Sequence, residues 1–216
     1  ARLEVGVVER QLVLGQLQAD EADRLAQLNL GDVVVLALPR GGVPVAAQVA
    51  KRLGAPLDLM LVRKVGLPGH EELALGAIAG PDGADWVVNP DVADASGLSD
   101  HEMAMLAERQ KPELRRRCAR YLGGRPPIPL AGKTAILVDD GIATGATVRA
   151  ALTALRRAAP NRIILAVPVA APDVIAALRS EVDQLICLEA PRGFYAVGAH
   201  YAAFPQVSDE EVISFL

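Results

Sequence analysis

The chain has 216 residues, of which 51% are apolar, with a formal net charge of −4 and a pI of about 5.4. This length fits one medium domain, and this apolar content supplies a sizeable core and excludes a disordered chain. The acidic balance disfavours bulk attraction to nucleic acid, and no apolar run approaches the roughly 20 residues of a membrane span.

The first residues and the cysteines bear on the compartment. The N-terminal stretch lacks the basic and apolar build of a secretory signal, and neither Cys118 nor Cys187 belongs to a Cys/His cluster. We therefore expect a cytoplasmic protein with reduced thiols and without structural zinc.

The first half of the chain opens with a scattered apolar pattern that predicts a helix over residues 7–29. A short run rich in β-branched residues, 32–38, predicts a fully buried strand, and residues 44–53 return to a helical pattern. A glycine-bearing loop is expected at 63–71. Further strands of this half are expected at three short runs: 57–62, 73–79 and 86–88.

A long charged helix and a stiff linker separate the two halves. Ser99 and Glu102 form a capping-box pair ahead of the helix, which reaches about Leu122 and is followed by a proline-rich linker at 125–129. The second half then alternates between strands (134–138, 162–169, 185–188) and helices (147–158, 173–180). This alternation predicts an α/β fold, a mainly parallel sheet flanked by helices, whose ligands bind beyond the carboxyl ends of the strands.

The segment ILVDDGIATGAT, residues 136–147, contains the most informative pattern. Asp139 and Asp140 end a buried strand, and adjacent carboxylates repel each other unless hydrogen-bond donors or a cation bind there. Gly145 allows a close backbone approach, and Thr144 and Thr147 add hydroxyl donors at a predicted helix N-terminus, which favours anions. Phosphate donors beside hydroxyl acceptors describe a ribose 5-phosphate site.

The run 135–147 resembles the 5-phosphoribosyl 1-diphosphate (PRPP) motif of type I phosphoribosyltransferases. In that family the two acids hold the ribose hydroxyls, which implies this role for Asp139 and Asp140. The implied 5-phosphate ligands follow them: Ala143, Thr144, Gly145, Ala146 and Thr147. A threonine-capped polar turn is the bland alternative, and the full pattern favours the family over it.

The resemblance extends to a second loop after the strand at 32–38. Arg40, Gly41 and Gly42 occupy the place where the family binds pyrophosphate, in a loop that in relatives often carries a cis peptide bond. An ordinary glycine turn is the alternative.

A third loop, residues 62–69, is similar to a mobile loop of adenine phosphoribosyltransferases that closes over the reacting centre. This similarity implies that Arg63 and Lys64 neutralise pyrophosphate and that Glu72, near the end of the loop, is a catalytic carboxylate. For either basic residue taken singly, a place in a solvent-exposed basic loop without a catalytic role is an equally weighted interpretation.

The acceptor is not readable from the sequence. Family members specific for 6-oxopurines carry an aspartate at the position of Ala143, and adenine and orotate enzymes lack it as this chain does. Aromatic residues gather after the last core strand, and we expect Phe194 and Tyr195 to contribute to the acceptor pocket, with Phe194 as the first choice for stacking on a base. That these rings pack onto the core instead is an equally weighted alternative.

The resemblance implies one phosphoribosyltransferase domain over residues 1–216, with a core at about 30–190 and a hood chiefly from 191–216. The implied enzyme is a homodimer of nucleotide salvage that transfers the phosphoribosyl group from PRPP to a nitrogenous base. Mg²⁺ would be held mainly by substrate and water near Asp139 and Asp140, without direct protein ligands. The alternative is a PRPP-sensing regulatory or RNA-binding protein on the same fold, for which the basic cluster 115–120 is the minority signal.

Overall fold

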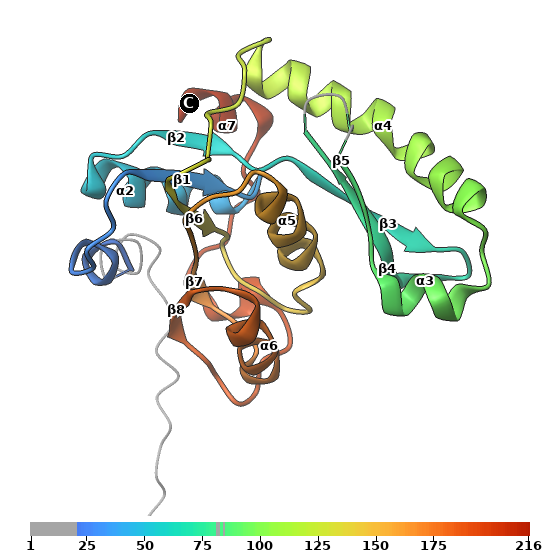
Figure 1. The fold of residues 1–216 in the computed structure, drawn as a ribbon. Coiled ribbons are helices and arrows are strands. Elements are labelled where there is room, and N and C mark those ends of the chain that lie inside the picture. Colours follow the sequence, from blue (N-terminus) through green and yellow to red (C-terminus); the bar gives the residue numbers. More distant parts are fainter. Residues whose placement is uncertain (1–20, 81–82, 84) are drawn as a thin grey trace, which may run out of the picture.

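A five-stranded parallel sheet forms the centre of the molecule, in a computed structural model that describes residues 21–80, 83 and 85–216 (Figure 1). Its strands, in spatial order, are β2 (Leu57–Leu59), β1 (Val33–Ala37), β6 (Thr134–Val138), β7 (Arg162–Val169) and β8 (Gln184–Glu189). The parallel sheet flanked by helices confirms the predicted fold class. Of the helix expected at 7–29, residues 21–26 are helical and the part before residue 21 lies outside the described residues.

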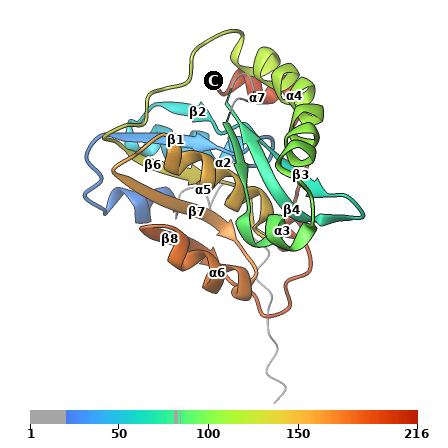
Figure 2. The ribbon, with the colours of Figure 1, turned by 45° about the vertical axis from the view of Figure 1, so that its right-hand side comes forward.

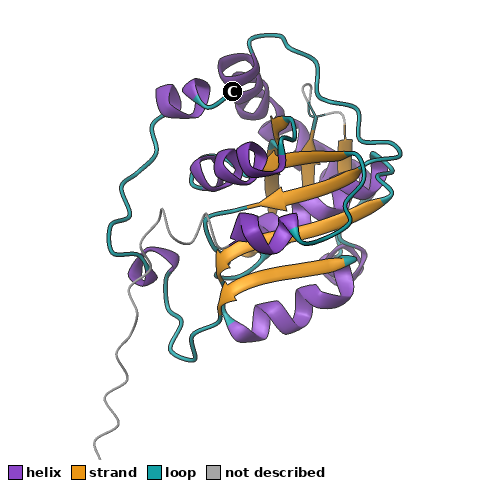
Figure 3. Cartoon of the chain, turned by 90° about the vertical axis from the view of Figure 1, so that its left-hand side faces the viewer, coloured by secondary structure: helices purple, strands orange, loops and turns teal. Residues whose placement is uncertain are grey.

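Helices cover both faces of this core sheet because its strands are apolar on both sides (Figure 3). On β1, Val33 and Val35 pack with α2 (Gly42–Leu53), whereas Val34 and Leu36 face the layer of α5 (Ala146–Arg157). Two shorter helices complete the two layers: α7 (Asp209–Ser214) beside α2 and α6 (Pro172–Leu178) beside α5.

A second sheet, formed by the first half of the chain, lies beside the core (Figure 2). It is antiparallel and consists of β3 (Val62–Leu67), β4 (His70–Ala79) and β5 (Asp85–Val88). The expected strand 57–62 was therefore wrong at its end, because the chain leaves the core sheet after Leu59. The expected loop at 63–71 was also wrong, because most of it pairs as a hairpin whose turn contains Gly69 with φ +80°.

Two further helices, α3 (Pro90–Ser96) and α4 (Asp100–Leu122), follow the second sheet. The capping box of Ser99 and Glu102 is present at the start of α4, as predicted. Ile78 of β4 packs with Leu114 of α4, and α5 contacts β3 and β4. The second sheet is thus held between α4 and the helical layer of the core.

The linker after α4 is anchored by a buried acid of the core sheet. Asp58, 2% exposed, pairs with Arg125 at 2.9 Å and accepts the backbone N–H of Ile128 at 2.8 Å. The chain then enters β6, which pairs with the edge of β1 that is not paired with β2. The topology therefore switches between β1 and β6, and the loops that follow these two strands meet at one edge. No helix in the described part of the chain is long and apolar enough to cross a membrane.

Candidate active site

The loops after β1 and β6 are in direct contact at the switch point. The N–H of Leu38 donates to the carbonyl of Val138 at 2.9 Å. A Cβ added to Gly41 would lie 1.7 Å from Oδ2 of Asp140, and one added to Gly42 would lie 2.8 Å from the carbonyl oxygen of Val138. A side chain at either position would force an atom of the other loop to move, so glycine is the residue that lets the two loops approach this closely.

The peptide bond between Pro39 and Arg40 in the first loop is cis, as the resemblance implied. The structure thus brings the three residues expected to bind pyrophosphate, Arg40, Gly41 and Gly42, next to the residues expected to bind ribose.

The paired carboxylates are electrostatically costly in the free protein. The N–H of Asp140 donates to Oδ1 of Asp139 at 2.9 Å. Burial raises the pKa of Asp139 well above its ordinary value, and the charge of Asp140 raises it further. Burial also raises the pKa of Asp140. Among the described residues no ion pair neutralises either carboxylate, so the pair is suited to hydroxyl donors or to a cation.

The loop from Ala143 to Thr147 leads into the N-terminus of α5. Gly145 is the N-cap in a left-handed conformation with φ +75° and has no side chain to cap the helix. One long hydrogen bond, 3.5 Å from the N–H of Ala146 to Oγ1 of Thr144, reaches the first turn. The side chains of Thr144 and Thr147 are exposed. The first N–H groups of α5 and these hydroxyls form a positive, accessible cradle for an anion. Arg149, bonded at 2.9 Å to Glu181, also donates to the carbonyl of Thr144 at 3.4 Å.

The segment 191–208 packs over the carboxylate loop. The hydroxyl of Tyr201, a residue 4% exposed, donates to the carbonyl of Asp140. A Cβ added to Gly141 would lie 2.6 Å from Val197 Cγ1, at the start of the short helix Val197–His200. The loop that carries the two carboxylates is therefore held on one side by the end of β6 and on the other side by this segment.

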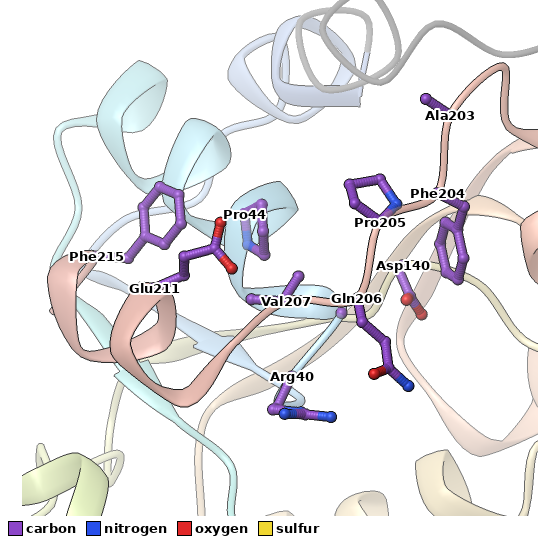
Figure 4. A pocket seen from close by; sticks show the side chains of 11 residues that line it. Arg40, Pro44, Asp140, Ala203, Phe204, Pro205, Gln206, Val207, Glu211 and Phe215 are labelled. Carbon is purple, nitrogen blue, oxygen red and sulfur yellow. The ribbon is translucent and has the colours of Figure 1, made fainter.

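A cavity of about 380 Å³ opens beside Asp140. Figure 4 shows Asp140 and Phe204 at one side of it, with Glu211 and Phe215 of the α7 region at the other. Arg40 comes from the loop after β1. The remaining lining residues are Gly41, Pro44, Ala203, Pro205, Gln206 and Val207. One cavity thus joins Asp140, the loop after β1 and an aromatic ring.

The aromatic residues after β8 divide into two groups. Phe194 stacks on His200 with ring centroids 5.0 Å apart and packs against the core, and Tyr195 is 81% exposed. Neither lines the cavity beside Asp140. Phe204 does, and its ring lies 5.0 Å from that of Tyr201. Sequence reasoning identified this aromatic cluster but selected Phe194 within it.

The basic residues of the hairpin point to opposite faces of β3. Nε of Arg63 donates to Oε1 of Gln110 on α4 at 2.7 Å, so Arg63 is turned toward α4. Lys64 points to the other face, which packs on α5. Glu72 lies on β4, and its side chain is outside the described part of the structure. In this conformation Arg63 bonds α4 and neither of the carboxylates.

The carboxylates also fit a bound Mg²⁺ that is shared with a substrate. In the described part of the chain no three His, Cys, Asp or Glu side chains gather to hold a metal. Asp139 and Asp140 repel each other in the free protein, and a cation beside them would relieve that repulsion. Mg²⁺ binds through one or two carboxylates together with phosphate oxygens and water, which matches this donor set.

The comparison with family models decides the identity. The phosphoribosyl transferase domain model matches residues 13–199. The chain belongs to this family. It is 49% identical over 195 residues to a provisionally named phosphoribosyl transferase of Mycobacterium tuberculosis, which covers 90% of this chain and 44% of the relative. The chain therefore spans less than half the length of that curated relative.

Two other similar proteins extend the comparison. The crystal structure of TT1426 from Thermus thermophilus superposes with a TM-score of 0.86 at 43% identity, covering 94% of this chain and 95% of that one. The bifunctional protein PyrR of Chloroflexus aurantiacus is 35% identical over 131 residues, 59% of this chain and 65% of PyrR. The fold of TT1426 is thus shared over almost the whole chain.

Proposed function

We propose that this chain transfers the 5-phosphoribosyl group of PRPP to a nitrogenous base and releases pyrophosphate. One observation carries the proposal: Asp140, Arg40 and Phe204 line one cavity, and the loop that follows Asp140 leads into the N-terminus of α5, where the N-cap residue is Gly145. The cavity offers chemistry complementary to ribose, pyrophosphate and base, and the helix N-terminus offers it to the 5-phosphate. The activity of a longer protein that contains this domain is part of the same proposal.

PRPP binds across the two loops of the switch point. The N–H groups and hydroxyls of 143–147 bind the 5-phosphate at the N-terminus of α5. Asp139 and Asp140 accept hydrogen bonds from the ribose hydroxyls, each worth about 1.5–3 kcal/mol because the acceptor is charged. These bonds also stabilise the ionised form of two carboxylates that burial disfavours in the free protein.

The leaving pyrophosphate takes its positive partners from two directions. Arg40 and the backbone of Gly41 and Gly42 contact it from the loop after β1. Lys64, with Arg63, approaches from the hairpin when the hairpin closes, and closure excludes water from the reacting carbon. Mg²⁺, held mainly by PRPP and water near Asp139 and Asp140, supplies further positive charge against the leaving group.

The acceptor base stacks on Phe204. A heteroaromatic ring on a protein aromatic gains about 1–3 kcal/mol, and Phe204 lies at the side of the cavity where Asp140 lies. Because Phe194 and Tyr195 lie outside this cavity, Phe204 takes the role that the sequence favoured for them. Gln206 offers an amide to the edge of the base.

The decisive experiment is a screen of purine and pyrimidine bases for pyrophosphate release with PRPP and Mg²⁺. We expect one base class to give turnover and Phe204→Ala to raise the KM of that base while the KM of PRPP stays unchanged. Phe194→Ala is the matched control and should lower thermal stability without a change in the KM of the base. Absence of PRPP binding by calorimetry would overturn the proposal.

The regulatory alternative is favoured by the similarity to PyrR and disfavoured by the basic cluster itself. Arg116 and Arg117 both pair with Glu113, and Arg120 pairs with Asp209 and Glu210. A cluster neutralised in this way offers little charge to a polyanion. A salt-dependent affinity for RNA would support the alternative. The homodimer, the cytoplasmic location and the hood at 191–216 stay predictions.

A further inference from the structure

An acidic residue outside the three expected loops contacts the pyrophosphate loop. Asp209 is the first residue of α7. Its carboxylate lies 3.6 Å from Nη1 of Arg40, measured at Oδ1. Among the described residues, this is the one ion pair of Arg40. The contact joins the C-terminal helix to the loop that follows β1.

Asp209 is itself held firmly from α4. Its Oδ2 lies 2.9 Å from Nε of Arg120, and its Oδ1 accepts the hydroxyl of Tyr121 at 2.6 Å. Tyr121 is buried, so this anchor is part of the packed contact between α4 and α7. The hydrogen bond from Tyr121 and the nearby guanidinium groups lower the pKa of Asp209, so the residue is charged at neutral pH.

The two sides of this network differ in strength. The contacts of Asp209 with α4 are short, whereas the contact with Arg40 is a single longer one. The Arg40 side chain is 42% exposed and borders the cavity. A guanidinium carries five N–H donors, so one loose contact orients it and leaves the other donors for a phosphate oxygen.

We propose that Asp209 is a positioning residue that acts through Arg40 and aims its guanidinium at the pyrophosphate of PRPP. The inference rests on the proposed function and adds a residue that no loop motif of the sequence marks. An arginine that is oriented before the ligand arrives loses less rotamer freedom on binding. Asp209 thereby makes α7 and α4 part of the pyrophosphate site.

The test compares Asp209→Asn with Glu210→Gln. Asparagine keeps an oxygen for Tyr121 but removes the charge that attracts Arg40. Glu210, the next residue, pairs with Arg120 at 2.7 Å and has a side chain that is 75% exposed, which makes it the matched control. With Mg²⁺ present, we expect Asp209→Asn to weaken pyrophosphate binding and to raise the KM of PRPP about five- to tenfold. The KM of the base should not change, and Glu210→Gln should stay within twofold of the unmodified protein.

A double-mutant cycle with Arg40→Ala separates positioning from general destabilisation. If Asp209 acts through Arg40, Asp209→Asn has no further effect on pyrophosphate binding in the Arg40→Ala background. The same loss in both backgrounds would overturn the inference, and so would unchanged or tighter binding by Asp209→Asn alone. Tighter binding would show that Asp209 competes with the ligand. Failure of the unmodified protein to bind PRPP would instead overturn the proposed function, and this inference with it.

Discussion

The central strands of the core sheet and the outer strand β3 of the second sheet differ in burial. Every residue of β1 and of β6 is buried, whereas Val65 is the one buried residue of β3. The core strands end in loops that touch each other through glycine, and the second sheet carries Arg63 and Lys64 on a hairpin. From this contrast we expect a division of roles: the core loops fix the geometry of PRPP, and the second sheet brings the positive charge of Arg63 and Lys64 to it.

The largest effect is expected where the core sheet meets the ligand. Replacing Asp139 and Asp140 together by Asn should weaken PRPP binding at least about 100-fold, because two charged hydrogen bonds of about 1.5–3 kcal/mol each are lost. The circular dichroism spectrum should stay that of the unmodified protein, since both side chains lie after the end of β6.

Calorimetry with PRPP measures this loss. Replacing Lys64 by Ala is the companion variant on the second sheet, and we expect it to lower kcat while the affinity for PRPP falls far less. Equal affinity losses in the two variants would contradict the division between the sheets.

The next largest effect tests the contact between the two core loops. Gly41→Ala places a methyl group on the Asp140 carboxylate, at an initial separation of 1.7 Å from Oδ2. The carboxylate must move, and a displacement of about 1 Å in a reacting site costs up to about 100-fold in rate. We expect kcat/KM for PRPP to fall between about tenfold and 100-fold.

The control for this variant is Gly193→Ala. An added Cβ at Gly193 meets nothing within 4 Å, so steady-state kinetics with PRPP should be unchanged. Unaltered kinetics for Gly41→Ala would show that the carboxylate does not need its observed position.

A smaller effect, confined to the second sheet, is expected in hydrogen exchange. Adding PRPP and Mg²⁺ should slow exchange at residues 63–72, because the hairpin closes over the bound ligand. Exchange in β6 should already be slow and should not change, because its strand is paired on both sides and fully buried. Equal protection of the hairpin with and without ligand would refute closure.

The same contrast explains which parts of the fold were readable from the sequence. The strands at 134–138 and 162–169 were predicted with their observed bounds, because continuous β-branched runs between turn residues have few other structures open to them. The hairpin of β3 and β4 was not predicted, because Gly66, Pro68 and Gly69 are typical of loops. Its strands are stabilised by pairing with each other and by contact with α4, and both are tertiary effects.

The site shows the same limit. Ligand loops after β1 and β6 could be located because glycine and acidic residues interrupt apolar strands at one sheet edge. The choice between Phe194 and Phe204 could not be made, since the irregular path of 191–208 decides which ring reaches the cavity. The role proposed for Asp209 could not be predicted for a similar reason, because its partners Arg40 and Tyr121 are distant in sequence.

The smallest effect concerns the stability cost of the binding carboxylates in the core. The folded-state pKa of Asp139 is raised above its unfolded value, so the folded protein holds this proton more tightly than the unfolded chain does. The associated stabilisation is complete below the unfolded pKa, about 3.9, and is lost as the pH rises through the folded pKa. Asparagine has no such proton to lose.

The melting temperature of Asp139→Asn should therefore exceed that of the unmodified protein by a margin that grows from pH 4 to pH 8. Each kcal/mol of unfolding free energy corresponds to a shift of roughly 2–4 °C in the melting temperature of a chain of this size. Asp94→Asn, at an exposed position of α3, is the control variant. Saturating PRPP and Mg²⁺ should reverse the order at pH 8, because a charged carboxylate accepts the ribose hydrogen bonds more strongly than an amide oxygen does. If the difference in melting temperature between Asp139→Asn and the unmodified protein did not change with pH, burial in the core would not destabilise the ionised Asp139. Any loss of stability due to the binding site would then have to arise in the second sheet.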